Sequence, residues 1–417
     1  MALKDRRVLF ISYNGMLDPL GQSQVIPYLR ELSGEGVRFT LLSFERAAAY
    51  SQEGLAKSES LRQQLAAHNI DWHWLRYHQR PSLPATVYDV AAGVNYARKL
   101  VRRNRIEMVH ARSHIPATIA LCLKKLFPLK MIFDVRGLMA EEYVDAEHWR
   151  EGGLPFRLTK RTERSMLRAT DGVVTLTERI WPIIKKWEGL RDRYVAHQVI
   201  PCCANLEVFK FDAEARARRR EELNLCDRFT LVYSGSIGGW YMTDKMADFF
   251  VELLKRRTDA HFLWLTTGRR ELVDRLMRER GVGASQYTVL RAASADVPSY
   301  LSASDAGIAF YKPGFSKLAT SPVKVTEYLA CGLPFVINAG VGDSDELVTR
   351  ERAGAMVRDF NAEEYARVAE GWMRVMEDKE GARHHAREVA RRLFDLRGVG
   401  LERSTRRGPP ARRSDGQ

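Results

Sequence analysis

The segments SASDAGIAF (302–310) and FVINAG (335–340), with TSPVKVTEYLACGL (320–333) between them, decide the fold. Both outer segments contain uninterrupted apolar runs, as strands covered on both faces do. The middle segment has helix signals: Ser321 can accept from free N–H groups at a helix start, Pro322 suits the first position, and Gly332 ends the helix. A strand, a helix and a strand in this order predict two parallel strands joined by a right-handed crossover.

The same alternation of strand and helix runs along both halves of the chain. The strand candidates are residues 8–13, 39–44, 72–77, 108–112, 131–137 and 172–177 in the first half, and 229–235, 261–268, 287–292, 307–311, 335–340 and 355–357 in the second. Six strands per half is typical of a doubly wound sheet, so the pattern predicts an α/β protein with two such domains in tandem.

The boundary between the domains is expected in VIPCCANLEVF (199–209), where a strand ends at Pro201 and a polar turn follows. We therefore expect a first domain at 1–205 and a second at 206–375. A C-terminal helix is expected at 376–400, and residues 401–417 lack periodicity and are expected to be a disordered basic tail.

Composition excludes several classes of protein. With 417 residues and 45% hydrophobic residues the chain has enough apolar side chains for full cores. It has no apolar run near the roughly 18–20 residues that span a bilayer. Its start resembles a first strand rather than a signal peptide. The five cysteines form no CxxC pair, so neither a disulfide framework nor a zinc site is indicated, and a reducing cytoplasm is expected.

The net charge of +14 is concentrated in the first half. Residues 1–205 carry 31 basic and 21 acidic side chains, whereas residues 206–417 carry 35 and 31. Basic runs occur in RKLVRRNRIE (98–107) and at helical spacing within PFRLTKRTERSMLRATD (155–171), and the members of the second run are Arg157, Lys160, Arg161, Arg164 and Arg168. A solvated helix face explains such runs, but an anionic partner at the first domain is an alternative.

Lys324 and Glu327 are the leading candidates for binding chemistry. Lys324 lies in the first turn of the predicted helix, whose N-terminus already favours anions. Glu327 lies about one turn later and is able to accept hydrogen bonds from two adjacent hydroxyls, as a carboxylate does with ribose. The alternative is a capped helix whose Lys and Glu are solvated.

These residues belong to a longer pattern, Ser-Pro-x-Lys-x-x-Glu-Tyr-x-Ala-x-Gly-x-Pro, which resembles the donor segment of family 4 glycosyltransferases. The resemblance extends to SYNGMLDPLGQSQVIPYLREL (12–32), RATDGVVTLTERI (168–180) and VIPCCANLEVF (199–209). It implies the GT-B fold, in which two Rossmann-like domains face each other across a cleft, and a retaining transfer from a nucleotide-diphosphate sugar. It also implies that Glu327 is the ribose ligand.

The chain departs from the family pattern at two positions. The first of the family's two glutamates, which contacts the sugar, is replaced by Ala319, and the arginine after the glycine of the diphosphate loop is replaced by Ser236. In the second domain the resemblance assigns donor binding to Glu327, Lys324, Ser321, Ser236, Gly238 and Lys245. A simple turn is the alternative for YSGSIGGWYMTDK (233–245).

In the first domain, KMIFDVRGLMAEEY (130–143) places Asp134 and Arg136 after a parallel strand, where such folds line their cleft. We predict a catalytic role for both, with Arg136 stabilising the leaving diphosphate or an acceptor phosphate. The alternative is an ion pair of Arg136 with a nearby glutamate, Glu141 or Glu142. Further cleft candidates are Arg112, His114, Gly15 and Gly21, although His114 is equally compatible with a purely hydrogen-bonded histidine and the glycines with a structural turn.

The sequence thus predicts a glycosyltransferase of bacterial surface polysaccharide synthesis that needs no metal or other cofactor. Its expected partners are a nucleotide-sugar donor, a glycan or lipid-diphosphate-linked acceptor and an anionic membrane surface, with a cytoplasmic or peripheral location at the inner face of the membrane. A nucleotide-sugar epimerase or hydrolase on the same scaffold is the alternative. A nucleic-acid-binding protein is disfavoured because aromatic residues are not interleaved with the basic ones.

Overall fold

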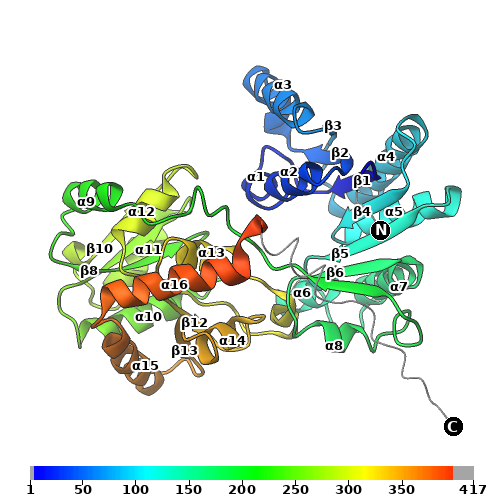
Figure 1. Cartoon of the computed structure of the whole chain (residues 1–417). Coiled ribbons are helices and arrows are strands. Elements are labelled where there is room, and N and C mark those ends of the chain that lie inside the picture. Colours follow the sequence, from blue (N-terminus) through cyan, green and yellow to red (C-terminus); the bar gives the residue numbers. More distant parts are fainter. Residues whose placement is uncertain (1–3, 398–417) are drawn as a thin grey trace, which may run out of the picture.

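The structure is a computed structural model that describes residues 4–397. It contains two domains, each built on one sheet whose strands all pair in parallel (Figure 1). The first sheet has the order β3-β2-β1-β4-β5-β6-β7 and the second has the order β10-β9-β8-β11-β12-β13. The predicted pair of doubly wound α/β domains is therefore confirmed, and the expected boundary at residue 205 falls between the two sheets.

The first domain alternates strands and helices. Its elements are β1 (Arg7–Ser12), α1 (Pro19–Gln24), α2 (Ile26–Gly34), β2 (Arg38–Glu45), η1 (Ala47–Tyr50), α3 (Gln52–Ala66), β3 (Ile70–Arg76), α4 (Ser82–Arg103), β4 (Met108–Arg112), α5 (His114–Leu126), β5 (Lys130–Val135), α6 (Met139–Asp145), α7 (Leu154–Ala169), β6 (Gly172–Thr175), α8 (Trp181–Ile184) and β7 (Ala196–Val199). The sheet has seven strands rather than six, because the short run that leads to Pro201 pairs with β6 as β7.

The second domain follows the same plan. Its elements are α9 (Ala213–Glu222), β8 (Phe229–Ser234), α10 (Thr243–Leu254), β9 (Ala260–Leu265), α11 (Arg270–Arg278), η2 (Ala284–Gln286), β10 (Tyr287–Leu290), α12 (Val297–Ala303), β11 (Ala306–Ala309), η3 (Phe315–Ala319), α13 (Val323–Ala330), β12 (Phe335–Asn338), α14 (Ser344–Thr349), β13 (Gly354–Val357), α15 (Ala362–Val375) and α16 (Lys379–Phe394). The predicted tail at 401–417 lies outside the described residues.

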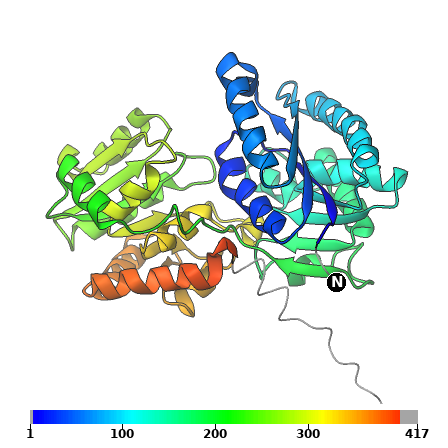
Figure 2. The ribbon, with the colours of Figure 1, turned by 45° about the horizontal axis from the view of Figure 1, so that its top comes forward.

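Each sheet is covered on both faces, which explains why its strands are apolar on successive residues. Figure 2 shows helices on both sides of the first sheet. In this domain one apolar cluster contains Leu9 and Ile11 of β1, and a second cluster on the other face contains Val8 and Phe10 of the same strand. The second sheet likewise has two clusters. Because helices cover the central strands, the carboxyl ends of the strands are the expected place for a site.

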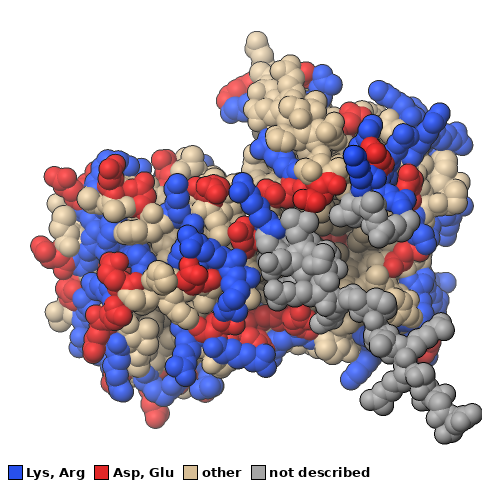
Figure 3. Space-filling model, in the orientation of Figure 1, with Lys and Arg blue, Asp and Glu red and all other residues tan. Residues whose placement is uncertain are grey.

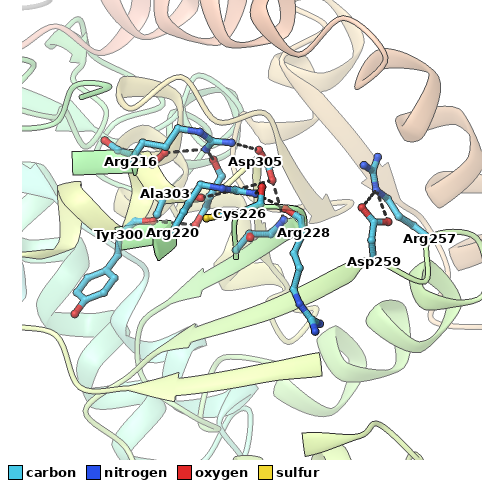
Figure 4. A network of polar contacts seen from close by, with 12 residues as sticks. Arg216, Arg220, Cys226, Arg228, Arg257, Asp259, Tyr300, Ala303 and Asp305 are labelled. Atoms are coloured by element: carbon cyan, nitrogen blue, oxygen red, sulfur yellow. Dashed lines mark hydrogen bonds and ion pairs between the residues drawn. The ribbon is translucent and has the colours of Figure 1, made fainter. Parts of the chain in front are cut away.

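A buried charge network anchors α9 to the second sheet (Figure 4). The Asp305 carboxylate, just before β11, lies 2.6 Å from Arg216 Nη2 and 3.3 Å from Arg220 Nη1, and it accepts from the Thr230 N–H at 2.8 Å. Burial favours a raised pKa of Asp305, but the two guanidinium groups and the Thr230 N–H hold this pKa below its usual value. The charged helix α9 at the start of the second domain is therefore a structural anchor.

The C-terminal helix α16 returns to the segment that links the domains. Arg387 on this helix donates to the carbonyl oxygens of Leu206, Phe209 and Ala330, so one side chain joins α16, the linker and α13. Within residues 4–397 no helix combines the length and apolar character needed to cross a membrane.

Candidate functional site

Lys324 on α13 is buried in the second domain inside a cage of three tyrosines. Its Nζ lies 3.4 Å from the ring centroid of Tyr241, 4.7 Å from that of Tyr233 and 5.5 Å from that of Tyr311. Nζ also lies 3.4 Å from the Tyr233 hydroxyl, to which it donates a weak hydrogen bond. The faces of aromatic rings attract a cation, so this cage holds an ammonium group that is only 7% exposed.

The charge of Lys324 is poorly balanced in this structure. Burial lowers the pKa of Lys324 well below its usual value, and Glu327 opposes that shift only in part. Within residues 4–397 no carboxylate oxygen lies within 4.0 Å of the Lys324 Nζ. A buried cation without a contacting counterion is costly unless an anion arrives, so this site is complementary to a negatively charged ligand.

Glu327 lies one helical turn after Lys324 and is partly exposed. Burial raises the pKa of its carboxyl to about 7, although Lys324 acts in the opposite direction. The carboxylate is therefore close to Lys324 without an ion pair, and it remains available to accept hydrogen bonds from a ligand. This is the arrangement that the sequence predicts for a pair that grips a phosphate and a ribose.

The glycine loop after β8 lies directly against Lys324. Gly235 has φ +152°, and a Cβ atom built there would lie 2.8 Å from Lys324 Nζ and 3.0 Å from the Tyr233 hydroxyl. The exposed Ser236 follows, and its carbonyl oxygen accepts from the Tyr233 hydroxyl at 2.5 Å. Gly238 has φ +74° and open space around it. Thus the structure brings together Ser236, Gly238, Lys324 and Glu327, four of the residues predicted to bind a donor.

The other two predicted donor residues have different roles in the structure. Ser321 does not cap α13, which begins at Val323; its Oγ accepts from the Cys202 N–H of the linker at 3.0 Å. Lys245 lies on α10, where its Nζ is 3.3 Å from Asp248 and 3.7 Å from Asp244. In this structure Lys245 forms these local ion pairs, and its contact with a diphosphate stays a prediction.

In the first domain, Arg112 and Asp134 lie at the carboxyl ends of β4 and β5, in register with each other. Asp134 is paired with Arg136, with 3.6 Å between Oδ1 and Nη1, rather than Arg136 with Glu141 or Glu142. His110 Nε2 lies 3.5 Å from the other Asp134 oxygen. Burial favours a raised pKa of Asp134, but Arg136 and His110 hold this pKa below its usual value.

These charged side chains line a small cavity next to the linker. Arg112, Asp134 and Arg136 face Tyr28 and Pro201 across a volume of about 30 Å³, enough for roughly one water molecule. Burial, together with the neighbouring Arg136, lowers the pKa of Arg112 to about 10. Two guanidinium groups and one carboxylate give the lining of this cavity a net positive charge. Such a lining would stabilise a ligand group that gains negative charge during a reaction.

The remaining first-domain candidates are structural. His114 is 3% exposed and pairs with Glu163 at 2.9 Å, so the prediction that it reaches the cleft is wrong. Gly15 contacts the buried Glu45, because a Cβ there would lie 2.5 Å from Glu45 Oε2, and Gly21 packs on the Gly15 carbonyl. Glu45 accepts from the Met16 N–H at 2.6 Å, so the glycines allow the loop to wrap around a carboxylate.

Sequence reasoning missed a second buried lysine where the domains meet. Lys317 of η3 lies with its Nζ 3.7 Å from the ring centroid of Trp240, which follows the glycine loop. Burial lowers its pKa, and Glu142 and Asp145 of the first domain oppose this shift. The adjacent aromatic residues Trp240 and Tyr241 thus contact Lys317 and Lys324 respectively. The available sequence signal was a lysine just before the predicted donor segment.

The segment containing η3 also explains why the family's first glutamate is absent. Ala319 is 1% exposed and belongs to the apolar core of the first domain, and the neighbouring Leu318 packs against the same core. Thr177 donates to the Leu318 carbonyl at 2.7 Å, and Ser316 N–H donates to Asp145 at 3.0 Å. A charged side chain at position 319 would be buried without solvent in this arrangement.

Comparison with known proteins relates the second domain to a family. Residues 228–374 match the model of the family described as glycosyl transferases group 1. The curated proteins contain no significant match to the sequence. The matched segment includes the glycine loop, Lys317, Lys324 and Glu327.

Solved structures share the fold of the whole chain at low identity. A glycosyltransferase from Rickettsia africae ESF-5 superimposes with a TM-score of 0.69 at 14% identity, covering 96% of this chain and 97% of that one. Anabaena Alr3699/HepE in complex with UDP and glucose also has a TM-score of 0.69 at 14% identity, with coverages of 96% and 98%. WaaG, a glycosyltransferase involved in lipopolysaccharide biosynthesis, has a TM-score of 0.64 at 14% identity, with coverages of 95% and 98%.

The fold and the matched domain agree with the geometry of the site. The sheets lie on either side of the linker, the buried Lys324 and the glycine loop are in the second domain, and Arg112, Asp134 and Arg136 lie at the strand ends of the first. The chain therefore carries a glycosyl transferases group 1 domain within a two-domain GT-B fold, and on these grounds it is an enzyme of the glycosyltransferase class.

Proposed function

We propose that the protein transfers a sugar, with retention of configuration, from a nucleotide-diphosphate sugar to a glycan or lipid-diphosphate-linked acceptor. The observation that carries this proposal is the buried Lys324, which contacts three tyrosine rings and no carboxylate within 4.0 Å among the described residues. A diphosphate would supply the missing negative charge. Glu327 would accept from the ribose hydroxyls, and the backbone at Ser236 and Gly238 would approach the phosphates.

In the proposed mechanism, the positive charge of the protein stabilises the leaving diphosphate. The acceptor hydroxyl attacks on the face from which the diphosphate departs, and a phosphate oxygen takes its proton. Such a reaction needs preorganised positive charge rather than a protein nucleophile. Lys324 supplies it from the second domain, and Arg136, held by Asp134, supplies it from the first. In this proposal lysine and arginine provide all of the charge, so no metal ion or other cofactor is required.

A panel of nucleotides tests this function directly. We expect UDP, GDP, ADP or CMP, or one of their sugars, to raise the melting temperature selectively, since a ligand that binds only the native state stabilises it. The stabilising sugar nucleotide is then incubated with glycoside acceptors, and the products are analysed by mass spectrometry. A glycoside product supports transfer, whereas free sugar or an epimer alone would favour a hydrolase or epimerase.

Donor affinity is expected to increase with pH through the neutral range. Glu327 has a pKa of about 7, and only its ionised form accepts from both ribose hydroxyls. Below pH 7 the carboxyl must lose a proton on binding, so affinity should fall by up to about tenfold per pH unit. Titration calorimetry with the stabilising sugar nucleotide from pH 5.5 to 8.5 measures this dependence. Glu327→Gln should bind more weakly and should lose the rise of affinity with pH; an unchanged slope would assign the titration to another group.

We also propose that the first domain contacts an anionic membrane at the cytoplasmic face, where surface polysaccharides are assembled. In Figure 3 basic side chains gather along the edge of this domain where α4, α5 and α7 lie. On α7, Arg164 and Arg168 pair with Glu188, and Lys160 pairs with Glu141 and Glu163, so these charges are partly neutralised. Each basic residue near an anionic surface contributes about 1 kcal/mol, and sedimentation with anionic vesicles at increasing salt tests this contact.

A further inference from the structure

His78 and Asp89 form a buried-carboxylate and imidazole pair in the first domain that the proposed chemistry does not use. His78 Nδ1 lies 2.6 Å from Asp89 Oδ1. The His78 backbone N–H donates to Asp89 Oδ2 at 3.0 Å, and the Tyr13 hydroxyl donates to the same oxygen at 2.8 Å. Three donors therefore fix one carboxylate, and the carboxylate in turn fixes the imidazole ring.

The pair presents one ring nitrogen outward. Asp89 is 1% exposed, whereas the His78 side chain is 38% exposed. With Nδ1 donating to Asp89, the neutral ring carries its lone pair on Nε2. Among residues 4–397 no hydrogen-bond partner of the His78 Nε2 is present. An orienting carboxylate behind an imidazole with a free acceptor nitrogen is the arrangement by which proteins aim a histidine at a ligand.

His73, on β3 just before His78, shows what a purely structural histidine looks like. Its Nε2 lies 2.9 Å from Asp71 and its Nδ1 lies 3.1 Å from the Tyr96 hydroxyl, so both ring nitrogens are used. His78 differs in having only one nitrogen used. Asp89 also accepts hydrogen bonds from the Tyr13 hydroxyl and the His78 backbone N–H, so it does not depend on the imidazole alone for hydrogen-bond donors.

The position of His78 connects it with the site. His78 follows β3, Tyr13 follows β1, and β3, β2, β1 and β4 are neighbours that all run parallel. Their carboxyl ends form one edge, which also carries Arg112. From β3 to β4 there are three strand spacings, or about 14 Å. This separation suits a short oligosaccharide extending along the edge, rather than one sugar ring.

The surroundings of His78 suit a sugar more than a simple anion. The Tyr88 ring is perpendicular to the imidazole with 5.1 Å between centroids, and this tyrosine is 61% exposed. On the neighbouring strand end, the Arg76 guanidinium covers Tyr50 at 5.7 Å. Exposed aromatic rings beside an oriented acceptor nitrogen match the apolar faces and hydroxyl groups of a saccharide.

We propose that His78 is a residue that contacts the acceptor, and that its Nε2 accepts a hydrogen bond from a hydroxyl of a saccharide acceptor. Asp89 is a positioning residue, which sets the tautomer and direction of the ring, and Tyr13 holds Asp89. The inference rests on the proposed function, because it concerns the part of the acceptor that lies away from the hydroxyl to which the sugar is transferred. It assigns that part of the acceptor to a glycan.

A binding experiment without donor tests the proposal. Protein labelled with ¹⁵N-histidine is titrated with octyl β-glucoside, octyl β-galactoside and octyl α-mannoside below their micelle concentrations, and the imidazole signals are followed by NMR. The His78 signals are identified by their loss in His78→Gln. We expect at least one glycoside to shift the His78 signals in a saturable way while the His73 signals stay in place, and inorganic phosphate to leave both unchanged.

Kinetic variants separate contact from folding. With the glycoside that binds, His78→Ala should raise the acceptor KM about tenfold, the value of one hydrogen bond, and leave the donor KM within twofold. Asp89→Asn should raise the acceptor KM similarly and also alter the His78 tautomer signals. His73→Gln is the matched control and should leave both KM values within twofold.

Three results would overturn the proposal: no glycoside moves the His78 signals, phosphate moves them instead, or His78→Ala weakens donor and acceptor alike. Failure of the proposed function would look different. No nucleotide would then stabilise the native protein and no transfer would occur, while the NMR titration, which contains no donor, would still report whether His78 contacts a sugar.

Discussion

Replacing Lys324 with alanine is expected to lower kcat/KM for transfer by about 100-fold to 1,000-fold, the usual effect of losing one preorganised group that stabilises a developing charge. The ammonium is enclosed by Tyr233, Tyr241 and Tyr311, and no other described cation contacts this cage. Stabilisation by the preferred nucleotide, measured as the shift in melting temperature, should fall together with kcat/KM.

Two further variants interpret this result. Lys324→Met keeps the apolar stem and removes a buried charge, so the protein without ligand should be at least as stable as the original. Lys245→Ala is the matched lysine control, because Lys245 is engaged with Asp244 and Asp248, and it should change kcat/KM by less than twofold. If Lys324→Met unfolded the protein, or if nucleotide binding survived it unchanged, the assignment of the diphosphate site would be wrong.

Replacing Asp305 with alanine is expected to destabilise the second domain by about 3–5 kcal/mol, because it leaves buried guanidinium groups without a counterion. Arg216 and Arg220 both contact this carboxylate, and the Thr230 N–H loses its acceptor as well (Figure 4). Urea denaturation followed by fluorescence measures the change, since Trp264 and Trp372 are buried in the same domain.

A second charge pair drawn in Figure 4 provides the control. Arg257 and Asp259 lie 3.0 Å apart but are 24% and 42% exposed, so Asp259→Ala should cost less than about 1 kcal/mol.

The pH dependence of stability is a further check on the Asp305 network. The folded pKa of Asp305 is lowered, so its stabilisation is present above the unfolded value of about 3.9 and is lost as pH falls through the folded pKa. Equal effects of the two substitutions would contradict the buried network.

Local patterns in the sequence predicted most of the fold and the pair at the centre of the candidate donor site. Apolar runs located twelve of the thirteen described strands, and Gly332, with φ +75°, ends α13 as expected. Lys324 and Glu327 were identifiable because their relation is set by one helical turn. The pairing of Lys245 with Asp248 is equally local, at a spacing of three residues, and was overlooked in favour of the resemblance.

The remaining features depend on contacts between distant segments. The tyrosines around Lys324 come from two stretches of the chain, Tyr233 and Tyr241 from the glycine loop and its flank and Tyr311 from just after β11. The first stretch is distant in sequence from Lys324, and η3 separates the second from it. The Ser321 hydroxyl accepts from the N–H of Cys202, which is 119 residues away, and His114 forms a hydrogen bond with Glu163, which is 49 residues away. A side chain with hydrogen-bonding capacity is assigned by whichever partner the tertiary fold brings to it, and that partner cannot be read from neighbouring residues.

The seating of Ala319 in the apolar core of the first domain has a consequence for engineering this enzyme. Replacing the second domain with that of a relative, in order to change the sugar that is transferred, would also replace η3 and Ala319, which pack in the core of the first domain. A relative with a glutamate at this position would bring a charge into an apolar seat. A chimera that folds would therefore need to take the first-domain residues around Ala319 from the same parent as η3. The two parental sequences would then have to be joined at a different place from the linker.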